Sequence, residues 1–103
     1  MKEKEQLSKL MIVFDEYSCK EENIEYWHAR DLQKLLGYTQ WRNFEIVIEK
    51  AKNACRNSKQ LINSHFAEFS KVVNHGGVAS QIVKDYKLTR YACYLIAQNG
   101  DSN

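Results

Sequence analysis

Residues 66–88 read FAEFSKVVNHGGVASQIVKDYKL, and this stretch decides the fold. Its first part, residues 66–73, fits helical spacing and is also rich in β-prone residues, so periodicity alone leaves helix and strand open. The Gly76-Gly77 pair that follows is typical of a tight turn, and the residues after it fall into a period-two register. We therefore predict a β-hairpin near residues 66–88, with its second strand over residues 80–88.

Four helices are predicted around this hairpin from the helical spacing of apolar residues. They cover residues 4–18, residues 29–36, a stretch from the N-cap Thr39 to about residue 57, and a stretch from the N-cap Thr89 to just before Gly100. Gly37 lies where a left-handed C-cap is expected for the second helix. In the third helix the apolar residues form one stripe that we expect to be buried: Phe44, Val47, Ile48, Ala51 and Cys55.

A short strand is predicted at the β-prone residues Ile24, Tyr26 and Trp27, after a polar run at residues 20–23 that breaks the helical pattern. Together with the hairpin, this strand would form a small antiparallel sheet. We expect an α+β fold, mostly helical, in which the helices cover one face of that sheet.

Size and composition fit one small domain. The chain has 103 residues, of which 44% are hydrophobic, enough for a single core. We divide it into residues 1–23, an N-terminal amphipathic helix and linker, and residues 24–103, the domain itself. Because the sequence ends soon after an apolar helix, we expect an N-terminal fragment of a longer protein. No apolar run approaches the roughly 18 residues of a membrane-spanning helix, and there is no signal peptide, so we expect a cytoplasmic location.

The charge is unevenly distributed along the chain. Residues 1–25 carry four lysines against seven acidic residues, whereas residues 26–103 carry eleven Lys or Arg against six acidic residues. The positive excess is largest over residues 41–60. An excess of this kind favours an anionic partner.

The strongest candidate site is therefore the third helix and its start. Its aromatic and basic residues are Trp41, Arg42, Lys50, Lys52, Arg56 and Lys59. Cations on one side of a helix neutralise phosphates, and an exposed aromatic ring stacks on unpaired bases. The alternative is that Trp41 belongs to the core and the cations form an ordinary solvated surface. The sequence leaves both interpretations open.

The hairpin is the second candidate site. Its loop, residues 75–77, and its strand residues Lys84 and Lys87 would reach into a nucleic-acid groove, as β-ribbons do. A plain turn that needs glycine is the simpler interpretation of the loop. Arg90 would contact either a phosphate or a nearby carboxylate such as Asp85, and we favour the structural role.

Nothing in the sequence indicates catalysis or metal binding. The histidines and cysteines are scattered: His28, His65, His75, Cys19, Cys55 and Cys93. No HExxH, GxSxG or Gly-rich phosphate loop is present, and an odd number of distant cysteines disfavours a disulfide framework. Cys93 lies in an apolar helix, where a buried thiol is usually inert. A metal site built from two of the cysteines and two of the histidines is disfavoured by spacing. We expect no enzyme, no catalytic residue, no metal and no cofactor.

Several segments resemble a known family. Residues 27–38, WHARDLQKLLGY, resemble the ARDLxKLLGY signature of BRO-type N-terminal domains, which occur in phage antirepressors and viral proteins. Residues 41–44 (WRNF), 50–58 (KAKNACRNS), 65–66 (HF) and 85–101 (DYKLTRYACYLIAQNGD) resemble the DNA-damage-inducible protein D family. The resemblance covers about residues 24–101. Family members usually continue with Asn-Gly-Asp-Pro, whereas this chain ends with Ser102 and Asn103 after Asp101.

The resemblance implies a bacterial protein induced in the SOS response, with an N-terminal α+β domain regarded as DNA-binding and a further C-terminal region. It also implies action on recombinase filaments formed on single-stranded DNA. The resemblance assigns none of these roles to an individual residue.

Two hypotheses follow. The first is a DNA-binding domain that contacts mainly phosphates through the basic residues above, with the preference for single- or double-stranded DNA left open. The second is an interaction module that binds a repressor, a recombinase or a second copy of itself. In that case the apolar stripe of the first helix would form the interface: Leu7, Leu10, Met11 and Phe14.

Overall fold

A computed structural model describes residues 12–74, 76–77 and 79–100 of the chain. The fold is α+β, as predicted, with one four-stranded antiparallel sheet in the order β1-β2-β4-β3. The strands and helices follow in the order β1 (Cys19–Glu21), β2 (Ile24–His28), α2 (Ala29–Leu35), α3 (Trp41–Asn57), α4 (Ile62–His65), β3 (Phe66–Val73), β4 (Gln81–Leu88) and α5 (Arg90–Asn99). Residues 12–16 are also helical, in agreement with the predicted first helix, and residues 4–11 of that helix lie outside the described part.

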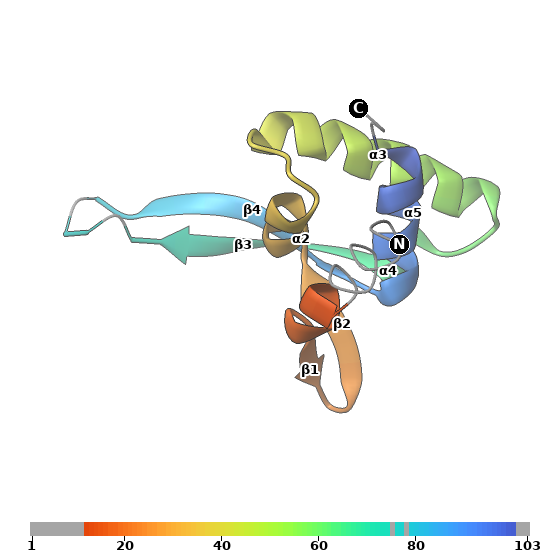
Figure 1. Ribbon diagram of the computed structural model, residues 1–103, viewed down its shortest axis with the longest axis horizontal. Helices are drawn as coiled ribbons and strands as arrows, with labels where there is room; N and C mark the ends of the chain where they lie inside the picture. The colour runs from red at the N-terminus through yellow and green to blue at the C-terminus, as the bar shows by residue number, and fades with distance from the viewer. Residues whose placement is uncertain (1–11, 75, 78, 101–103) are drawn as a thin grey trace, which may run out of the picture.

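The predicted hairpin is confirmed, and it is the longest feature of the molecule. Strands β3 and β4 pair without a break from Phe66↔Leu88 to Val73↔Gln81. Together they extend well beyond the helices (Figure 1). We call the part of this hairpin from residue 70 to residue 84 the arm. The second strand begins at Gln81, one residue later than predicted.

The strand predicted at Ile24, Tyr26 and Trp27 is confirmed as β2, which extends to His28 and joins the root of the hairpin through Trp27↔Leu88 and His28↔Lys87. Strand β1 was not predicted, and here the sequence interpretation was wrong. The polar run at residues 20–23 is no linker, because Glu22 and Asn23 adopt positive φ angles of 51° and 68° and turn the chain directly into β2. A two-residue turn with both φ angles positive matches the twist of a hairpin.

Helices α2 and α3 begin and end close to their predicted positions. Gly37 has φ 82°, which only glycine adopts without strain, so the predicted left-handed end of α2 is confirmed. The predicted N-cap Thr39 is wrong. Gln40 is the N-cap residue of α3, and its side chain makes no capping hydrogen bond. The helix starts where Trp41 packs its ring near the rings of Phe44 and Tyr86, so packing rather than capping sets this end.

Helix α5 has the predicted N-cap, since the Thr89 hydroxyl accepts a hydrogen bond from the backbone N–H of Ala92 at 3.1 Å. Gly100 follows the helix as expected, and its backbone is extended. Its lack of a side chain serves a close approach, because a Cβ there would lie 2.7 Å from the Tyr38 hydroxyl. The single turn α4 was not predicted.

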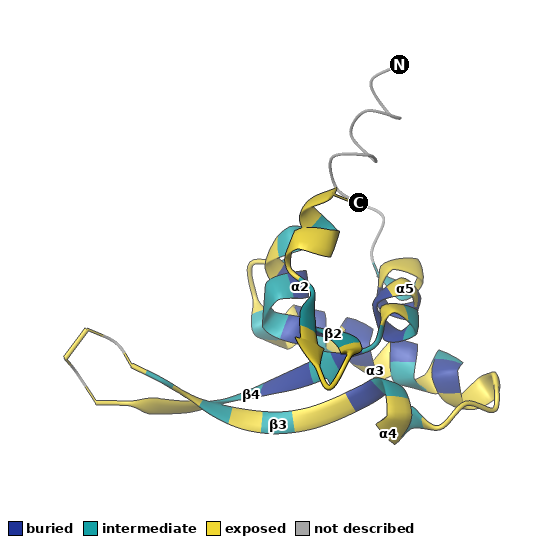
Figure 2. Cartoon of the chain, turned by 90° about the horizontal axis from the view of Figure 1, so that it is seen from below, coloured by how far each residue is buried: buried dark blue, intermediate teal, exposed yellow. Residues whose placement is uncertain are grey.

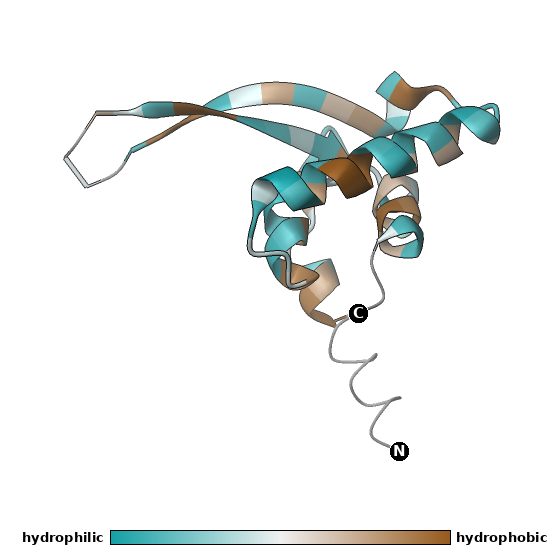
Figure 3. Cartoon of the chain, turned by 90° about the horizontal axis from the view of Figure 1, so that it is seen from above, coloured by the Kyte–Doolittle hydropathy of each residue, from teal (hydrophilic) through white to brown (hydrophobic). Residues whose placement is uncertain are grey.

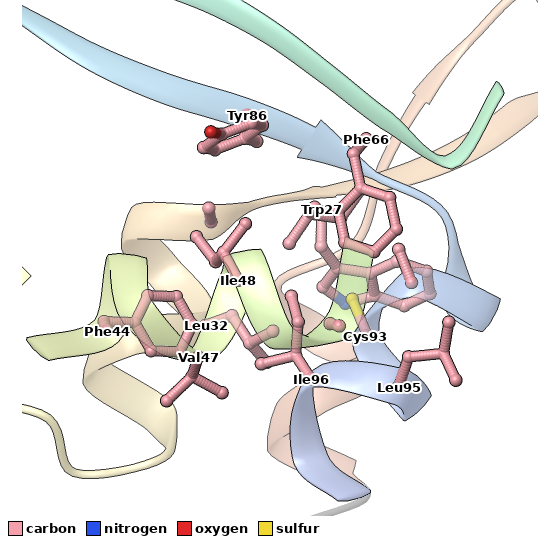
Figure 4. Close-up of a cluster of buried hydrophobic side chains, with 14 of the residues drawn as sticks. Trp27, Leu32, Phe44, Val47, Ile48, Phe66, Tyr86, Cys93, Leu95 and Ile96 are labelled. Atoms are coloured by element: carbon pink, nitrogen blue, oxygen red, sulfur yellow. The ribbon is translucent and has the colours of Figure 1, made fainter. Parts of the chain in front are cut away.

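The core lies between the sheet root and helices α2, α3 and α5 (Figure 2). The predicted stripe of α3 is buried in full, and α5 adds Cys93, Leu95 and Ile96 opposite it (Figure 4). Trp27 is fully buried, stacks on Phe14 at 4.3 Å between ring centroids, and donates its indole N–H to the Phe14 carbonyl at 2.7 Å. None of the described helices is long and apolar enough to cross a membrane.

Candidate nucleic-acid interface

Helix α3 runs along the side of the domain away from the β1–β2 hairpin and carries most of the predicted cations (Figure 1). Arg42, Lys50 and Arg56 are exposed on it, and Lys59 is exposed just beyond its end. We call these four residues the α3 cations. In the described part of the chain none of the four forms an ion pair with a carboxylate, and Arg56 only donates to the Asn53 side chain at 2.8 Å. They therefore remain available to an external anion.

Lys52, also predicted for this surface, turns toward the sheet instead. Its ammonium lies 3.1 Å from the Glu49 carboxylate and donates to the Tyr86 hydroxyl at 3.0 Å. Although burial disfavours the charged form, these two hydrogen bonds raise the pKa of Lys52 overall. Lys52 thus holds α3 to β4.

Lys84 and Lys87, the predicted cations of the hairpin, are also paired. Lys84 lies 2.8 Å from Glu45 on α3, and the hydrogen bond to this carboxylate raises the pKa of the lysine. Lys87 lies 3.0 Å from Glu21 on β1, which likewise raises its pKa. These lysines join elements of the domain to each other.

Trp41 is half-buried and is not a free platform for a base. The Arg30 guanidinium lies 4.0 Å from the centre of its ring, and the Tyr86 ring lies 6.5 Å away. The Arg30 guanidinium also donates to the Lys84 carbonyl at 2.9 Å, so α2 covers the tryptophan. The cation–π contact fills the place that a stacked base would take.

Between α3 and the hairpin lies a shallow groove with balanced charge. Its lining residues are Arg42, Glu45, Ile46, Glu49, Lys52, Glu68 and Lys84. Three cations face three carboxylates, and the two lysines among these cations are paired with carboxylates of the groove. Arg42 forms no such pair in the described part of the chain, and the other α3 cations do not line the groove.

Arg90 has the structural role that we favoured, but its predicted partner Asp85 is wrong. Its guanidinium bonds Glu25 at 2.9 Å and Asp15 at 3.3 Å, and the bond from Arg90 lowers the pKa of Glu25. These contacts tie α5 to β2 and to the end of the first helix. Sequence reasoning missed them because the carboxylates are distant along the chain.

Asp85 is instead the centre of a buried network that sequence reasoning missed. It is fully buried, and its Oδ1 accepts from the backbone N–H groups of Arg30 at 3.1 Å and Tyr86 at 2.8 Å. Its Oδ2 lies 2.7 Å from the Lys71 ammonium and 3.6 Å from His28 Nδ1. Asp85 therefore caps α2 from the neighbouring strand, where the N-cap residue His28 supplies no side-chain bond.

The arm carries apolar residues that sequence reasoning also missed as site candidates. Val72 and Ile82 pair directly across the two strands, and their side chains are 64% and 73% exposed. Hydrophobic positions on the outer part of the arm are visible in Figure 3. The sequence does not show that these two residues are exposed and share one face of the hairpin, and both facts are needed to recognise them as site candidates.

An apolar groove with a cavity volume of about 360 Å³ lies between α2 and α5. Leu35 and Leu36 line one side of it, and Tyr94 and Ala97 line the other. The side chain of Tyr94 is 59% exposed there. Phe14, predicted as an interface residue, borders this groove while it stacks on Trp27; Leu7, Leu10 and Met11 lie outside the described residues.

The histidines and cysteines that the structure describes do not gather in one place. Burial raises the pKa of the Cys93 thiol to about 12, and Cys55 is buried as well. His65 is bonded to the Thr89 hydroxyl at 2.7 Å. Among the described residues, no three His, Cys, Asp or Glu side chains are close enough together to hold a metal ion.

Comparison with known proteins bears on this surface. The BRO family, N-terminal domain, matches residues 16–103. The chain belongs to the BRO family. This BRO-type domain is also 51% identical over 77 residues to DNA damage-inducible protein D of Escherichia coli (strain K12). That alignment covers 75% of this chain and 28% of the relative, so the BRO-type domain corresponds to little more than a quarter of the relative's length. No solved structure matches it significantly.

Proposed function

We propose that this BRO-type domain is the DNA-binding part of a protein of the bacterial SOS response, and that it binds rather than catalyses. It binds DNA mainly through phosphates, which the α3 cations contact. One observation carries the proposal: in the described structure these four cations are exposed and free of carboxylates, whereas the other predicted cations pair within the domain. The name of the relative, which records induction by DNA damage, supports it.

The dimensions of α3 suit this role. Arg42 and Arg56 are fourteen residues apart, or about 21 Å along the helix axis. Duplex DNA carries one phosphate charge per roughly 1.7 Å of axis, so a helix of this length faces several phosphates. The first turn of α3 carries Arg42 and no acidic residue, so the helix dipole adds to the positive charge there.

The salt dependence of DNA affinity tests the proposal. We expect the logarithm of the binding constant to fall linearly with the logarithm of salt concentration, for a labelled duplex and a labelled single strand measured by fluorescence anisotropy. The triple variant Arg42→Gln, Lys50→Gln, Arg56→Gln should flatten the slope by about 0.9 for each duplex phosphate that the variant no longer neutralises.

The matched control is Lys20→Gln, Lys34→Gln, which removes exposed cations from β1 and α2 instead. It should change the slope little. Equal changes of the slope per removed charge in the two variants would reduce the site to net charge alone, and a wild-type chain that binds neither nucleic acid at low salt would contradict the proposal.

A second candidate function is oligomerisation, and the apolar groove between α2 and α5 favours it. The occupant would be the helical segment at residues 12–16 of a second copy, whose Ile12 and Val13 are exposed. Interaction with recombinase filaments stays a prediction.

A further inference from the structure

The arm is long enough to enter a groove of DNA. The contacts of Lys71 with Asp85 and of Lys84 with Glu45 are the last side-chain ion pairs that hold it to the domain in the described part of the chain. From Ser70↔Lys84 to Val73↔Gln81 the two paired strands of the arm extend for about 10 Å at the rise of an extended strand. Most of the described residues in the outer part of the arm have the colour of exposed residues in Figure 2.

The side chains of the arm are of kinds that can contact DNA. Residues 69–84 contain two lysines and no Asp or Glu. Side chains alternate between the faces of a strand, so Val72, Ile82 and Lys84 lie on one face, with both apolar side chains open to solvent. A carboxylate-free ribbon with an apolar patch avoids repulsion by phosphates while offering contacts to base edges.

We propose that the arm inserts into the major groove of double-stranded DNA and places Val72 and Ile82 against base edges, where they contact thymine methyl groups. This inference rests on the proposed DNA-binding function. The major groove is about 12 Å wide and 8.5 Å deep and admits a two-stranded ribbon, whereas the minor groove is only about 6 Å wide. Laid flat in this groove, the paired strands turn the face that carries Val72 and Ile82 toward the base edges.

The structure also argues for a duplex rather than a single strand. Proteins that bind single strands stack bases on exposed aromatic rings. The arm, residues 70–84, contains no Phe, Tyr or Trp. At its root Tyr86 is buried, Phe69 is half-buried beside the His28 ring, and Trp41 is covered by Arg30. The arm therefore offers methyl groups and backbone rather than stacking platforms.

Thymine methyl groups provide the probe. Affinity is measured for an A·T-rich duplex and for the same duplex with every thymine replaced by uracil, which removes the major-groove methyl and keeps base pairing. The wild-type chain should bind the uracil duplex about fourfold more weakly for each methyl group that is removed from the interface. Val72→Ser, Ile82→Ser should weaken binding to the thymine duplex by a similar factor and bind both duplexes equally, with an unchanged salt slope.

Ile24→Ser is the matched control, because Ile24 is equally exposed, at 66%, on β2 away from the arm. It should keep the wild-type preference for thymine. A second variant replaces residues 72–82 by Asn-Gly, a turn that joins the paired residues Lys71 and Val83. None of the buried core residues lies in that segment, so the domain should stay folded and lose the same preference.

The outcomes separate the two proposals. If the wild-type chain binds both duplexes equally while the α3 variant still flattens the salt slope, the arm proposal is wrong and DNA binding stands. If light scattering shows that the arm variants dissociate a dimer and their DNA affinity is unchanged, the arm contacts protein instead. If the wild-type chain binds no DNA at low salt, both proposals are overturned.

Discussion

At the scale of single residues, Asp85 shows how one buried side chain can join three elements. It accepts hydrogen bonds from backbone N–H groups of α2 and of its own strand β4, and it forms an ion pair with Lys71 on β3. A fully buried carboxylate is tolerated only when it is hydrogen-bonded and paired, as here. The root of the arm is therefore held by charge as well as by packing.

Asp85→Ala is expected to lower the free energy of unfolding by about 3 kcal/mol, because it leaves the N–H groups of Arg30 and Tyr86 without an acceptor and Lys71 without a partner. Asp85→Asn keeps an acceptor for the N–H groups and should cost less, about 1–2 kcal/mol. Urea denaturation followed by circular dichroism measures both.

The control is Glu16→Ala, which removes an exposed carboxylate and should stay within about 0.5 kcal/mol of the wild type. If the Asp85→Ala variant is as stable as this control, the bonds of Asp85 to α2 and to Lys71 do not contribute to the free energy of unfolding.

At the scale of secondary-structure elements, the two hairpins differ in which residues adopt the positive φ angles of their turns. The β3–β4 hairpin places glycines at positive φ, at Gly76 and Gly77. The β1–β2 hairpin places Glu22 and Asn23 there instead. Asparagine tolerates the left-handed region, whereas glutamate is less stable in this conformation by roughly 1 kcal/mol.

Glu22→Gly should therefore raise the free energy of unfolding by about 0.5–1 kcal/mol, because it relieves the positive φ at the first turn position. Chemical denaturation of the variant beside the wild type measures this. Glu16→Gly in the helical segment should have the opposite effect, since glycine destabilises a helix. A destabilised Glu22→Gly chain would indicate that the Glu22 side chain is needed in the turn.

At the scale of the whole molecule, the acidic first quarter of the sequence neutralises cations of the rest. Asp15 and Glu25 hold Arg90, and Glu21 holds Lys87, so the positive excess remains mainly on α3. The helices and the sheet root form the core, the arm extends beyond it, and an apolar groove lies between α2 and α5.

The oligomerisation candidate makes its own prediction at this scale. If the groove between α2 and α5 joins two copies, light scattering gives twice the monomer mass of 12.1 kDa, and Tyr94→Arg restores the monomer while circular dichroism shows an unchanged fold. Ile46→Arg, an exposed apolar position on α3, should leave the dimer intact. A wild-type chain that is monomeric at high concentration would contradict this candidate.

Much of the fold followed from local pattern. The hairpin around residues 66–88, the buried stripe of α3, the cap at Thr89 and the left-handed Gly37 each depend on neighbours within a few residues, so they were predicted. Strand β1 was missed because its turn uses Glu22 and Asn23 rather than glycine. The candidate cations of α3 were also visible in the sequence, although their role as a site remains a prediction.

The sequence by itself determined most of the helices and strands, β1 and α4 excepted, and which face of α3 is buried, because hydrophobic period and capping act over short distances. Only the tertiary structure decided which charges are free. Lys52, Lys84 and Lys87 carry the same charge as Arg42, Lys50 and Arg56, and differ from them in the carboxylate that folding brings to each of the three lysines. The physical reason is that a charge is neutralised by what lies within a few ångströms in space, whatever its distance along the chain.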